Sequence, residues 1–538
     1  MGRKVLLYDT TLRDGCQGTG ISFALADKID IARRLDEFGF DYVEGGWPGS
    51  NPKDEEFFDA LKTAPLRRAR LTAFGRTRHA GARAELDANL NGLIVAGTPA
   101  VAIFAKAWDF QVEVVLRTTL EENLAMVRDS VGYLKGAGRE VILDAEHFFD
   151  GHRANQEYAV AVLAAAAEAG ADWLVLCDTN GGALPDAVAQ VVAGIVARFD
   201  VPVGIHAHND GELAVANSLA AVAAGARQVQ GTVNGYGERI GNANLCSVLP
   251  NLVLKDDLEC AAGEHLAELT GLSRAIEGMA NLVPNPRLPY VGAAAFAHKG
   301  GVHVHAVAAD PRTYEHVDPA SIGNERKILV SELSGRQSII ERAQSLGLDL
   351  DDRSPAASEV VRRIKQLELE GYQFEDAEGS FALLVHRCSP SYRQPFEPLA
   401  YHIDIHKAAT DEGSHSRASA EVAVDGKVLR GEASGGGPID ALENALRRAL
   451  IPAYPHLERV SLVDFRAYVG RVRGGPRGNI AVRITASAPG SPPWTTIGSA
   501  RDLLHAAWIA LTDTLELAVL KSAGATEAIG EIAPTRER

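Results

Sequence analysis

The stretch VPVGIHAHND (201–210) places two histidines on a segment with the composition of a buried β-strand. β-Branched residues, which favour strands, lead into them. Side chains alternate along a strand, so His206 and His208 share one face while Val203 and Ile205 share the other. We expect the aliphatic face to pack against helices, which leaves the imidazoles facing something polar.

Two interpretations of that polar face are open. A histidine in a protein core is commonly satisfied by hydrogen bonds to neighbouring carbonyl groups. Two histidines at positions i and i+2, followed by Asn209 and Asp210, favour a metal site instead. The remainder of the chain has to decide between the two.

The fold around this strand follows from a repeated pattern in the first half of the chain. Eight short runs rich in β-branched and aromatic residues alternate with helical segments, of which 26–39 and 157–170 are the clearest and end at glycine. Strands alternating with helices imply parallel pairing, and eight such units predict a closed (β/α)8 TIM barrel over residues 1–275. A doubly wound open sheet is the alternative, but no GxGxxG follows the first strand. The eight runs are 5–10, 42–47, 70–75, 100–105, 140–145, 173–178, 201–208 and 228–234.

Polar side chains gather at the carboxyl ends of these runs, where TIM barrels carry their chemistry. The first, seventh and eighth strands become neighbours when the barrel closes, so Asp14 can reach His206 and His208. This convergence favours the metal site over buried structural histidines. The residues at these strand ends are Arg13, Asp14, Glu44, Glu146, Asp178, Thr179, His206, His208 and Asn234.

Two further regions follow the barrel. Residues 276–375 are predicted to form a helical linker subdomain, and they carry a second histidine cluster, FAHKGGVHVHA (296–306). Its glycines suit either a loop close to a ligand or an ordinary surface turn. Residues 376–538 are predicted to form a C-terminal α+β regulatory domain with an internal pseudo-repeat, each half being several strands and one helix. The predicted strands are 380–387, 401–408 and 416–424, then 461–472, 478–487 and 493–498; the helices are 438–450 and 499–520.

The bulk composition narrows the class of protein. A chain of 538 residues is too long for one hydrophobic core. Its net charge of −16 argues against a nucleic-acid partner. The 5 cysteines are scattered without a CxxC pair, as in a reducing cytoplasm. The N-terminus lacks the pattern of a signal peptide, and the apolar run 158–177 is interrupted by Glu168 and Asp172. We therefore predict a cytoplasmic protein with no membrane segment.

One aspartate and two histidines suit a divalent ion such as Zn, Mn, Mg, Co or Fe(II). Non-haem iron oxygenases use a similar ligand set, but on a different fold. With few protein ligands, the ion keeps positions open for a 2-oxo acid, whose carbonyl and carboxylate oxygens chelate together. Arg13 can neutralise charge that develops on the carbonyl oxygen, and a histidine of the second cluster can act as general base. The residues thus predict metal-assisted carbon–carbon bond chemistry on a 2-oxo acid.

Several motifs resemble one family of enzymes. DTTLRDGCQ (9–17), HAHNDGELAVANSLAAVAAGA (206–226) and GTVNGYGERIGNAN (231–244) are similar to the 2-isopropylmalate, homocitrate and citramalate synthases, which are metal-dependent Claisen-condensing barrel enzymes. The resemblance is strongest to the citramalate synthase branch, and it covers nearly the whole chain. The segments that carry it are EGGWPGSNPKDEEFF (44–58), DAEHFFDG (144–151), LCDTNGG (176–182), FAHKGGVH (296–303), LVSELSGRQS (329–338) and WTTIGSARDLLHAAWIAL (494–511).

The resemblance implies a role for each candidate residue. Asp14, His206 and His208 would bind the metal, with Asn242 as a further or water-mediated ligand. Arg13 and Thr179 would hold the 2-oxo acid, Gln17 would line the site, and Glu146 would orient substrate or water. His303 would be the base that enolises acetyl-CoA, with His298 as the weaker candidate that otherwise contributes to substrate binding.

The resemblance also implies a reaction and its partners. The citramalate branch joins acetyl-CoA to pyruvate in isoleucine biosynthesis, is a homodimer and is regulated by an amino acid, isoleucine or leucine. Three alternatives stay open: the same chemistry on another 2-oxo acid, a lyase or aldolase that cleaves the bond, and a scaffold without catalysis. The lyases generally lack the effector domain, and the intact set of candidate residues speaks against a scaffold.

Overall fold

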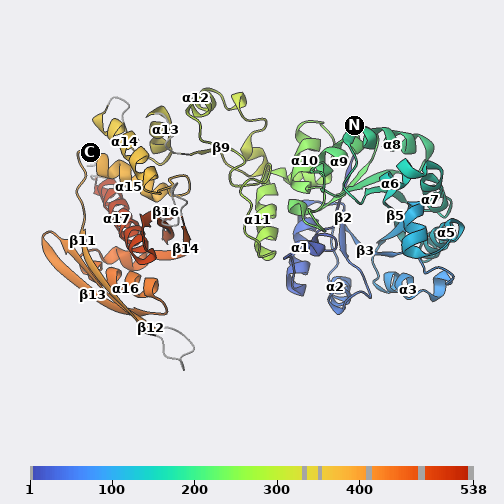
Figure 1. The fold of residues 1–538 in the computed structure, drawn as a ribbon, viewed down its shortest axis with the longest axis horizontal. Helices are drawn as coiled ribbons and strands as arrows, with labels where there is room; N and C mark the ends of the chain where they lie inside the picture. The colour runs from blue at the N-terminus through green and yellow to red at the C-terminus, as the bar shows by residue number, and fades with distance from the viewer. Residues whose placement is uncertain are drawn as a thin grey trace, which may run out of the picture. The chain divides into compact units, whose positions relative to one another are not determined.

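All eight predicted strands form, and they close into a parallel barrel in chain order (Figure 1). Each strand pairs with the next, and the eighth returns to pair with the first. The TIM barrel is therefore confirmed, and the open sheet is excluded. The computed structural model describes residues 4–329, 336–348, 350, 354–406, 415–469 and 479–530. The strands are β1 (Leu6–Asp9), β2 (Tyr42–Gly46), β3 (Arg70–Arg76), β4 (Ala100–Lys106), β5 (Glu140–Glu146), β6 (Trp173–Asp178), β7 (Val203–Ala207) and β8 (Gln228–Gly231).

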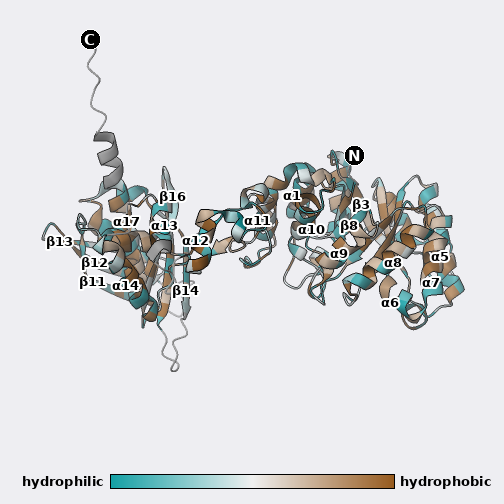
Figure 2. Cartoon of the chain, turned by 90° about the horizontal axis from the view of Figure 1, so that it is seen from above, coloured by the Kyte–Doolittle hydropathy of each residue, from teal (hydrophilic) through white to brown (hydrophobic). Residues whose placement is uncertain are grey.

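Helices connect the strands and surround the barrel, and those such as α5, α7 and α8 carry both hydrophobic and hydrophilic residues (Figure 2). In the helix after β1, Ile31, Leu35 and Phe38 are buried at helical spacing, and Gly39 ends the helix with a left-handed φ of 99°. The helices of this part are α1 (Leu25–Phe38), α2 (Pro52–Thr63), α3 (Ala88–Val95), α4 (Asp109–Gln111), α5 (Leu120–Gly136), α6 (Phe148–Ala154), α7 (Gln156–Glu168), α8 (Pro185–Arg198), α9 (Ala214–Ala223), α10 (Leu245–Leu254) and α11 (Leu269–Met279).

A polar network lies at the amino-terminal end of the barrel. The carboxylate of Glu140 accepts hydrogen bonds from the hydroxyl of Tyr42 at 2.6 Å, the indole of Trp173 at 3.2 Å and the guanidinium of Arg70 at 2.8 Å. These groups satisfy one another, as structural residues at the stability face of a TIM barrel do. The opposite end of the strands is thus the place to look for chemistry.

The chain divides into two units, and the second unit comprises Ala297–Glu315 and Lys327–Arg538. It begins with two short paired strands and several helices. The segment LVSELSGRQS (329–338) lies largely outside the described residues. The elements are β9 (Ala297–His298), α12 (Gly301–Ala309), β10 (Lys327–Ile328), α13 (Arg336–Ser345), α14 (Pro355–Leu369) and α15 (Glu378–Cys388).

The predicted strand 380–387 is wrong, because this segment lies in α15. Phe381, Leu384, Val385 and Cys388 stand at positions i, i+3, i+4 and i+7, and they pack in one hydrophobic cluster with α14. A short apolar run fits both a strand and a helix, and here the helical period decides.

The rest of the second unit confirms the internal pseudo-repeat. Two three-stranded antiparallel sheets are each followed by one helix. Gly431 and Gly498 occupy equivalent places in the third strands: a Cβ there would lie 2.1 Å from the carbonyl oxygen of Ala445 or Ala506 in the following helix. The elements are β11 (Glu397–His406), β12 (His415–Val424), β13 (Lys427–Gly435) and α16 (Pro438–Leu450), then β14 (Ser461–Val469), β15 (Ile480–Ala488), β16 (Ser491–Ala500) and α17 (Leu503–Gly530).

Among the described helices, one is long and apolar enough to cross a bilayer by composition alone. It is the Leu503–Ser522 part of α17, and 72% of its most apolar stretch is buried inside the fold. Burial of this kind is what the core helix of a folded domain requires, and α17 shares one hydrophobic core with both sheets of the repeat.

Candidate active site

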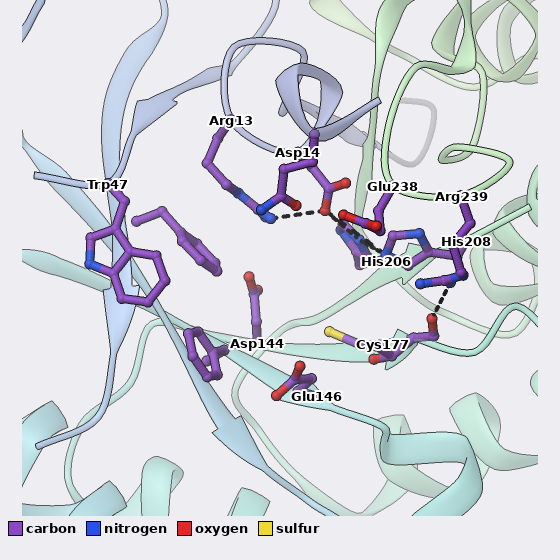
Figure 3. Close-up of a pocket in the computed structure, with 14 residues that line it drawn as sticks. Arg13, Asp14, Trp47, Asp144, Glu146, Cys177, His206, His208, Glu238 and Arg239 are labelled. Carbon is purple, nitrogen blue, oxygen red and sulfur yellow. Dashed lines mark hydrogen bonds and ion pairs between the residues drawn. The ribbon is translucent and has the colours of Figure 1, made fainter. Parts of the chain in front are cut away.

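Three side chains meet at the carboxyl end of the barrel and can hold one metal ion (Figure 3). Asp14 follows β1, His206 belongs to β7 and His208 comes just after it. The two Nε2 atoms are 3.4 Å apart and lie 3.7 and 3.9 Å from Oδ2 of Asp14. Two nitrogen ligands about 2.1 Å from one ion, at a near-tetrahedral angle, stand about 3.4 Å apart. The spacing therefore fits two ligands of one cation.

The protonation of this cluster also suits a cation. Burial lowers the pKa of His206, and burial with the neighbouring His206 lowers the pKa of His208 to about 4. Burial alone would raise the pKa of Asp14, but Arg13 and the two imidazoles hold it below its usual range. At neutral pH the cluster thus offers two neutral imidazoles and one carboxylate, the forms that bind metals.

Asn242 completes the group beside Asp14. Its amide nitrogen donates to Oδ1 of Asp14 at 2.9 Å and to the carbonyl of Tyr236 at 3.1 Å. Its own Oδ1 is buried and has no hydrogen-bond partner among the described residues. A buried amide oxygen without a donor is costly unless a ligand uses it. The residues present therefore fit a divalent cation.

Arg13 is held in place by three contacts. Its Nε donates to Oε2 of the fully buried Glu44 at 2.6 Å, and Nη1 donates to Oδ2 of Asp14 at 2.8 Å. Its guanidinium carbon lies 3.8 Å from the centre of the Phe74 ring. Glu44 also accepts hydrogen bonds from Tyr8 and Thr10, each at 2.5 Å. A rigid guanidinium is thereby presented beside the cluster.

The cluster opens into a cavity of about 290 Å³, and Arg13, Asp14, His206 and His208 line it. Aromatic rings form another part of its wall: Phe74 and Phe104 stack with centres 5.6 Å apart, and Trp47 meets both edge-on. Closely packed rings cannot move apart easily to enlarge the cavity, so the cavity suits a small substrate.

Three other predicted site residues also line this cavity: Gln17, Thr179 and Glu146. The Thr179 hydroxyl oxygen accepts a hydrogen bond from the backbone N–H of His147 at 2.8 Å, so its hydrogen remains available for an anion. Glu146 forms an ion pair with Lys106. The structure thus brings together eight of the predicted residues, Asn242 contacting Asp14 from outside the cavity lining.

Comparison with known proteins agrees with this geometry. Residues 4–276 match the HMGL-like family, 290–371 the homocitrate synthase post-HMGL domain-like family, and 379–519 the LeuA allosteric (dimerisation) domain. An (R)-citramalate synthase from Aquifex aeolicus is 48% identical over 97% of this chain and 99% of its own length. One from Geobacter sulfurreducens is 47% identical over 96% and 98%. The chain belongs to the HMGL-like family, in its citramalate synthase branch. A probable 2-isopropylmalate synthase from Methanopyrus kandleri is 34% identical over 84% and 86%.

The two remaining candidate site residues of this chain are His298 and His303, and both belong to its second unit. His298 is buried, and its Nε2 lies 3.0 Å from Oε1 of Glu315. His303 is exposed on α12 and stacks on Tyr314 with ring centres 4.0 Å apart. His298 is thus tied to a carboxylate, whereas the His303 imidazole is accessible.

Other residues of the cavity were not singled out from the sequence. They include the aromatic wall, Asp144 and Arg239, whose guanidinium donates to the Thr179 carbonyl and to Asp210 at 2.7 to 2.8 Å. Burial raises the pKa of Asp144 to about 8, so this carboxyl group is largely neutral at pH 7. Arg239 lies in the loop after β8, and the other residues lie near the carboxyl ends of their strands. That position was the available signal, but an aromatic residue there is equally typical of a core.

Proposed function

We propose that this chain is an (R)-citramalate synthase, which joins acetyl-CoA to pyruvate and releases CoA. The observation that carries the proposal is the buried group of Asp14, His206 and His208 beside Arg13 in a small cavity. Five relatives named (R)-citramalate synthase are 43–48% identical over 95–97% of the chain. Relatives named as 2-isopropylmalate synthases are 34% and 29% identical.

Asp14, His206 and His208 hold a divalent cation, with Asn242 as a further ligand. When bound, such an ion polarises a ketone as a Lewis acid. Arg13 stabilises the negative charge that develops on the ketone oxygen, because its guanidinium is already oriented by Glu44. Thr179 donates its hydroxyl hydrogen to the carboxylate of the 2-oxo acid, and Gln17 lines the same pocket.

The base in this proposal is His303, which removes a proton from the methyl group of acetyl-CoA. The resulting carbon attacks C2 of pyruvate, a carbon–carbon bond forms, and the ketone oxygen takes a proton to become a hydroxyl group. Water then cleaves the thioester, which yields citramalate and CoA. Glu146 orients the substrate or that water, and His298 supports substrate binding.

The parts of the chain divide these tasks. Residues 1–275 form the catalytic barrel, 276–375 supply helical segments to the active site, and 376–538 regulate. The match of residues 379–519 to an allosteric (dimerisation) domain supports a homodimer and an amino-acid effector, isoleucine or leucine. In the family, the helical segment of one subunit reaches the partner's active site. A dimer would therefore be needed to complete each active site.

The cavity size predicts the preferred ketone. Each added methylene that a pocket does not accommodate costs about 1–3 kcal/mol, or about 10- to 200-fold in kcat/KM. Because Trp47, Phe74 and Phe104 wall the cavity, we expect kcat/KM to fall in the order pyruvate, 2-oxobutyrate, 2-oxoisovalerate. CoA release with a thiol reagent measures this, with and without isoleucine or leucine. A branched ketone that ranks above pyruvate would contradict the citramalate assignment.

Asp144 favours a second candidate, a synthase for a specialised 2-oxo acid. Its carboxyl group lines the cavity, and with a pKa raised by burial to about 8 it can donate a hydrogen bond at neutral pH. A 2-oxo acid with a hydroxyl group on its side chain would use that donor. Adding such a ketone to the panel separates the two candidates. A carbon–carbon lyase is a weaker alternative, because such lyases generally lack a C-terminal effector domain and this chain has one that matches at residues 379–519.

His303→Ala tests the proposed base. We expect kcat to fall by about 10²- to 10⁴-fold, as for other general bases, while Mn²⁺ and pyruvate binding stay unchanged in calorimetry. His305→Ala is the matched control, because His305 is exposed on the same helix two residues away. If pyruvate binding is lost in His303→Ala, or turnover stays normal, His303 is not the base.

A further inference from the structure

A buried glutamine lies beside one of the proposed metal ligands. β7 and β8 pair in parallel with His206 opposite Gln230 in register. Gln230 is fully buried, and both side chains face the interior of the barrel. The Oε1 atom of Gln230 lies 3.0 Å from Nδ1 of His206. The ring nitrogen that points away from Asp14 therefore has a defined partner.

The surroundings of the glutamine orient its amide group. Its Nε2 donates to Oδ1 of Asp144 at 3.1 Å and lies 3.4 Å from Oε1 of Gln228. An oxygen atom of each neighbour faces the amide nitrogen, and Oδ1 of Asp144 can accept its hydrogen bond even when the carboxyl group carries a proton on its other oxygen, so the amide oxygen is left for His206. With Oε1 as acceptor, Nδ1 of His206 has to carry the proton.

We propose that Gln230 is a positioning residue of the metal site, which fixes His206 in the tautomer whose Nε2 is free to bind the cation. This inference rests on the proposed metal site and adds to it the residue that prepares one ligand. Metal-binding histidines generally donate their other N–H group to a carboxylate, carbonyl or water, which sets ring orientation and tautomer. The Nε2 of His206 lies 3.7 Å from Oδ2 of Asp14, on the side of the cluster.

The two proposed histidine ligands, His206 and His208, differ in whether Nδ1 has a hydrogen-bond partner. Nδ1 of His208 is buried and has no hydrogen-bond partner within the described part of the chain. His206 is thus the ligand whose ring is fixed by protein contacts. A neutral amide as partner also leaves the charge of the site unchanged, whereas a carboxylate in its place would add negative charge and tighten cation binding.

The test is the dissociation constant of Mn²⁺ alone, measured on the full chain by electron paramagnetic resonance without substrates. Gln230→Met keeps the size of the side chain but removes the acceptor, and we expect about 10- to 100-fold weaker binding. Gln230→Glu retains an acceptor oxygen and is expected to bind Mn²⁺ at least as tightly as the wild type. Gln228→Met is the matched control: Gln228 is equally buried on the same face of β8 and makes no hydrogen bond with His206 in the described structure. This substitution removes the weaker of the two acceptors of the Gln230 amide and leaves the closer one, Oδ1 of Asp144, in place.

The results distinguish a failure of the proposed metal site from a failure of the role proposed for Gln230. A wild-type protein that binds no Mn²⁺ overturns the metal site, and with it this inference. If the wild type binds but Gln230→Met binds equally well, only the role of Gln230 is overturned. Equal losses in Gln228→Met and Gln230→Met, or a loss in Gln230→Glu that matches Gln230→Met, would also overturn it, because they indicate a general effect on packing. Melting temperatures of the metal-free variants show whether each is folded.

Discussion

His206→Ala is expected to abolish CoA release and to leave the purified protein nearly free of metal. His206 is buried, and its Nε2 faces both other proposed ligands at 3.4 and 3.7 Å. Losing even a hydrogen-bond partner of a ligand costs about 10- to 100-fold in metal affinity, so losing the ligand itself should cost more than about 100-fold. Metal content after gel filtration and CoA release from acetyl-CoA and pyruvate measure the effect.

The control is His265→Ala. His265 belongs to the same unit, but it pairs with Glu268 and does not line the cavity. We expect this variant to keep its metal and its activity. Excess Mn²⁺ should restore part of the activity of His206→Ala if the defect is metal affinity. Normal metal content together with full turnover in His206→Ala would contradict ligation by His206.

The barrel could be predicted because its signal is local and repeated. Each strand is a short β-branched run, and each is followed by an amphipathic helix such as α1, which ends at Gly39. Eight repetitions leave few alternative topologies. The polar residues at the strand ends could then be assigned to one face, and Asp14, His206 and His208 do meet there.

The C-terminal domain was harder because its signals were ambiguous. The run 380–387 was interpreted as a strand, although its apolar residues also follow the helical period, and α15 is what forms. The third strand of the first sheet was not predicted. It is β13, which follows β12 after a turn at Asp425 and Gly426, both of which have positive φ. Asp-Gly between alternating residues is a strong signal for a hairpin turn. That signal was present in the sequence.

The contacts that prepare the site could not be predicted. Glu44 was noted at the end of a strand, but nothing in the sequence says that its carboxylate holds Arg13. Gln230 touches His206 only because β7 and β8 pair in one particular register. Such contacts depend on the stagger of the closed barrel, which residue types alone do not specify.

Arg13→Lys is expected to lower kcat/KM for pyruvate by about 10²- to 10³-fold, the usual cost of removing one donor that stabilises a developing oxyanion. The guanidinium contacts Glu44, Asp14 and the Phe74 ring together. A lysine ammonium is a point charge on a flexible chain, so it cannot reproduce these contacts and keep a directed N–H for the ketone. Steady-state CoA release at varied pyruvate measures the loss.

Arg70→Lys is a closely matched control for this substitution. Arg70 also binds a glutamate, Glu140, at 2.8 Å, and its guanidinium carbon lies 5.5 Å from the centre of the Tyr42 ring. Arg70 begins β3, at the amino-terminal end of the barrel, so we expect kcat/KM within about threefold of wild type even if stability falls. Equal losses in both variants would mean that arginine packing, not charge at the ketone, explains Arg13→Lys. The two arginines share the same kinds of partner, a glutamate and an aromatic ring, but they lie at opposite ends of the barrel, and Arg70 is also the more exposed of the two. A loss confined to Arg13→Lys would therefore assign the effect to the carboxyl face of the barrel and its buried guanidinium, where the chemistry is proposed.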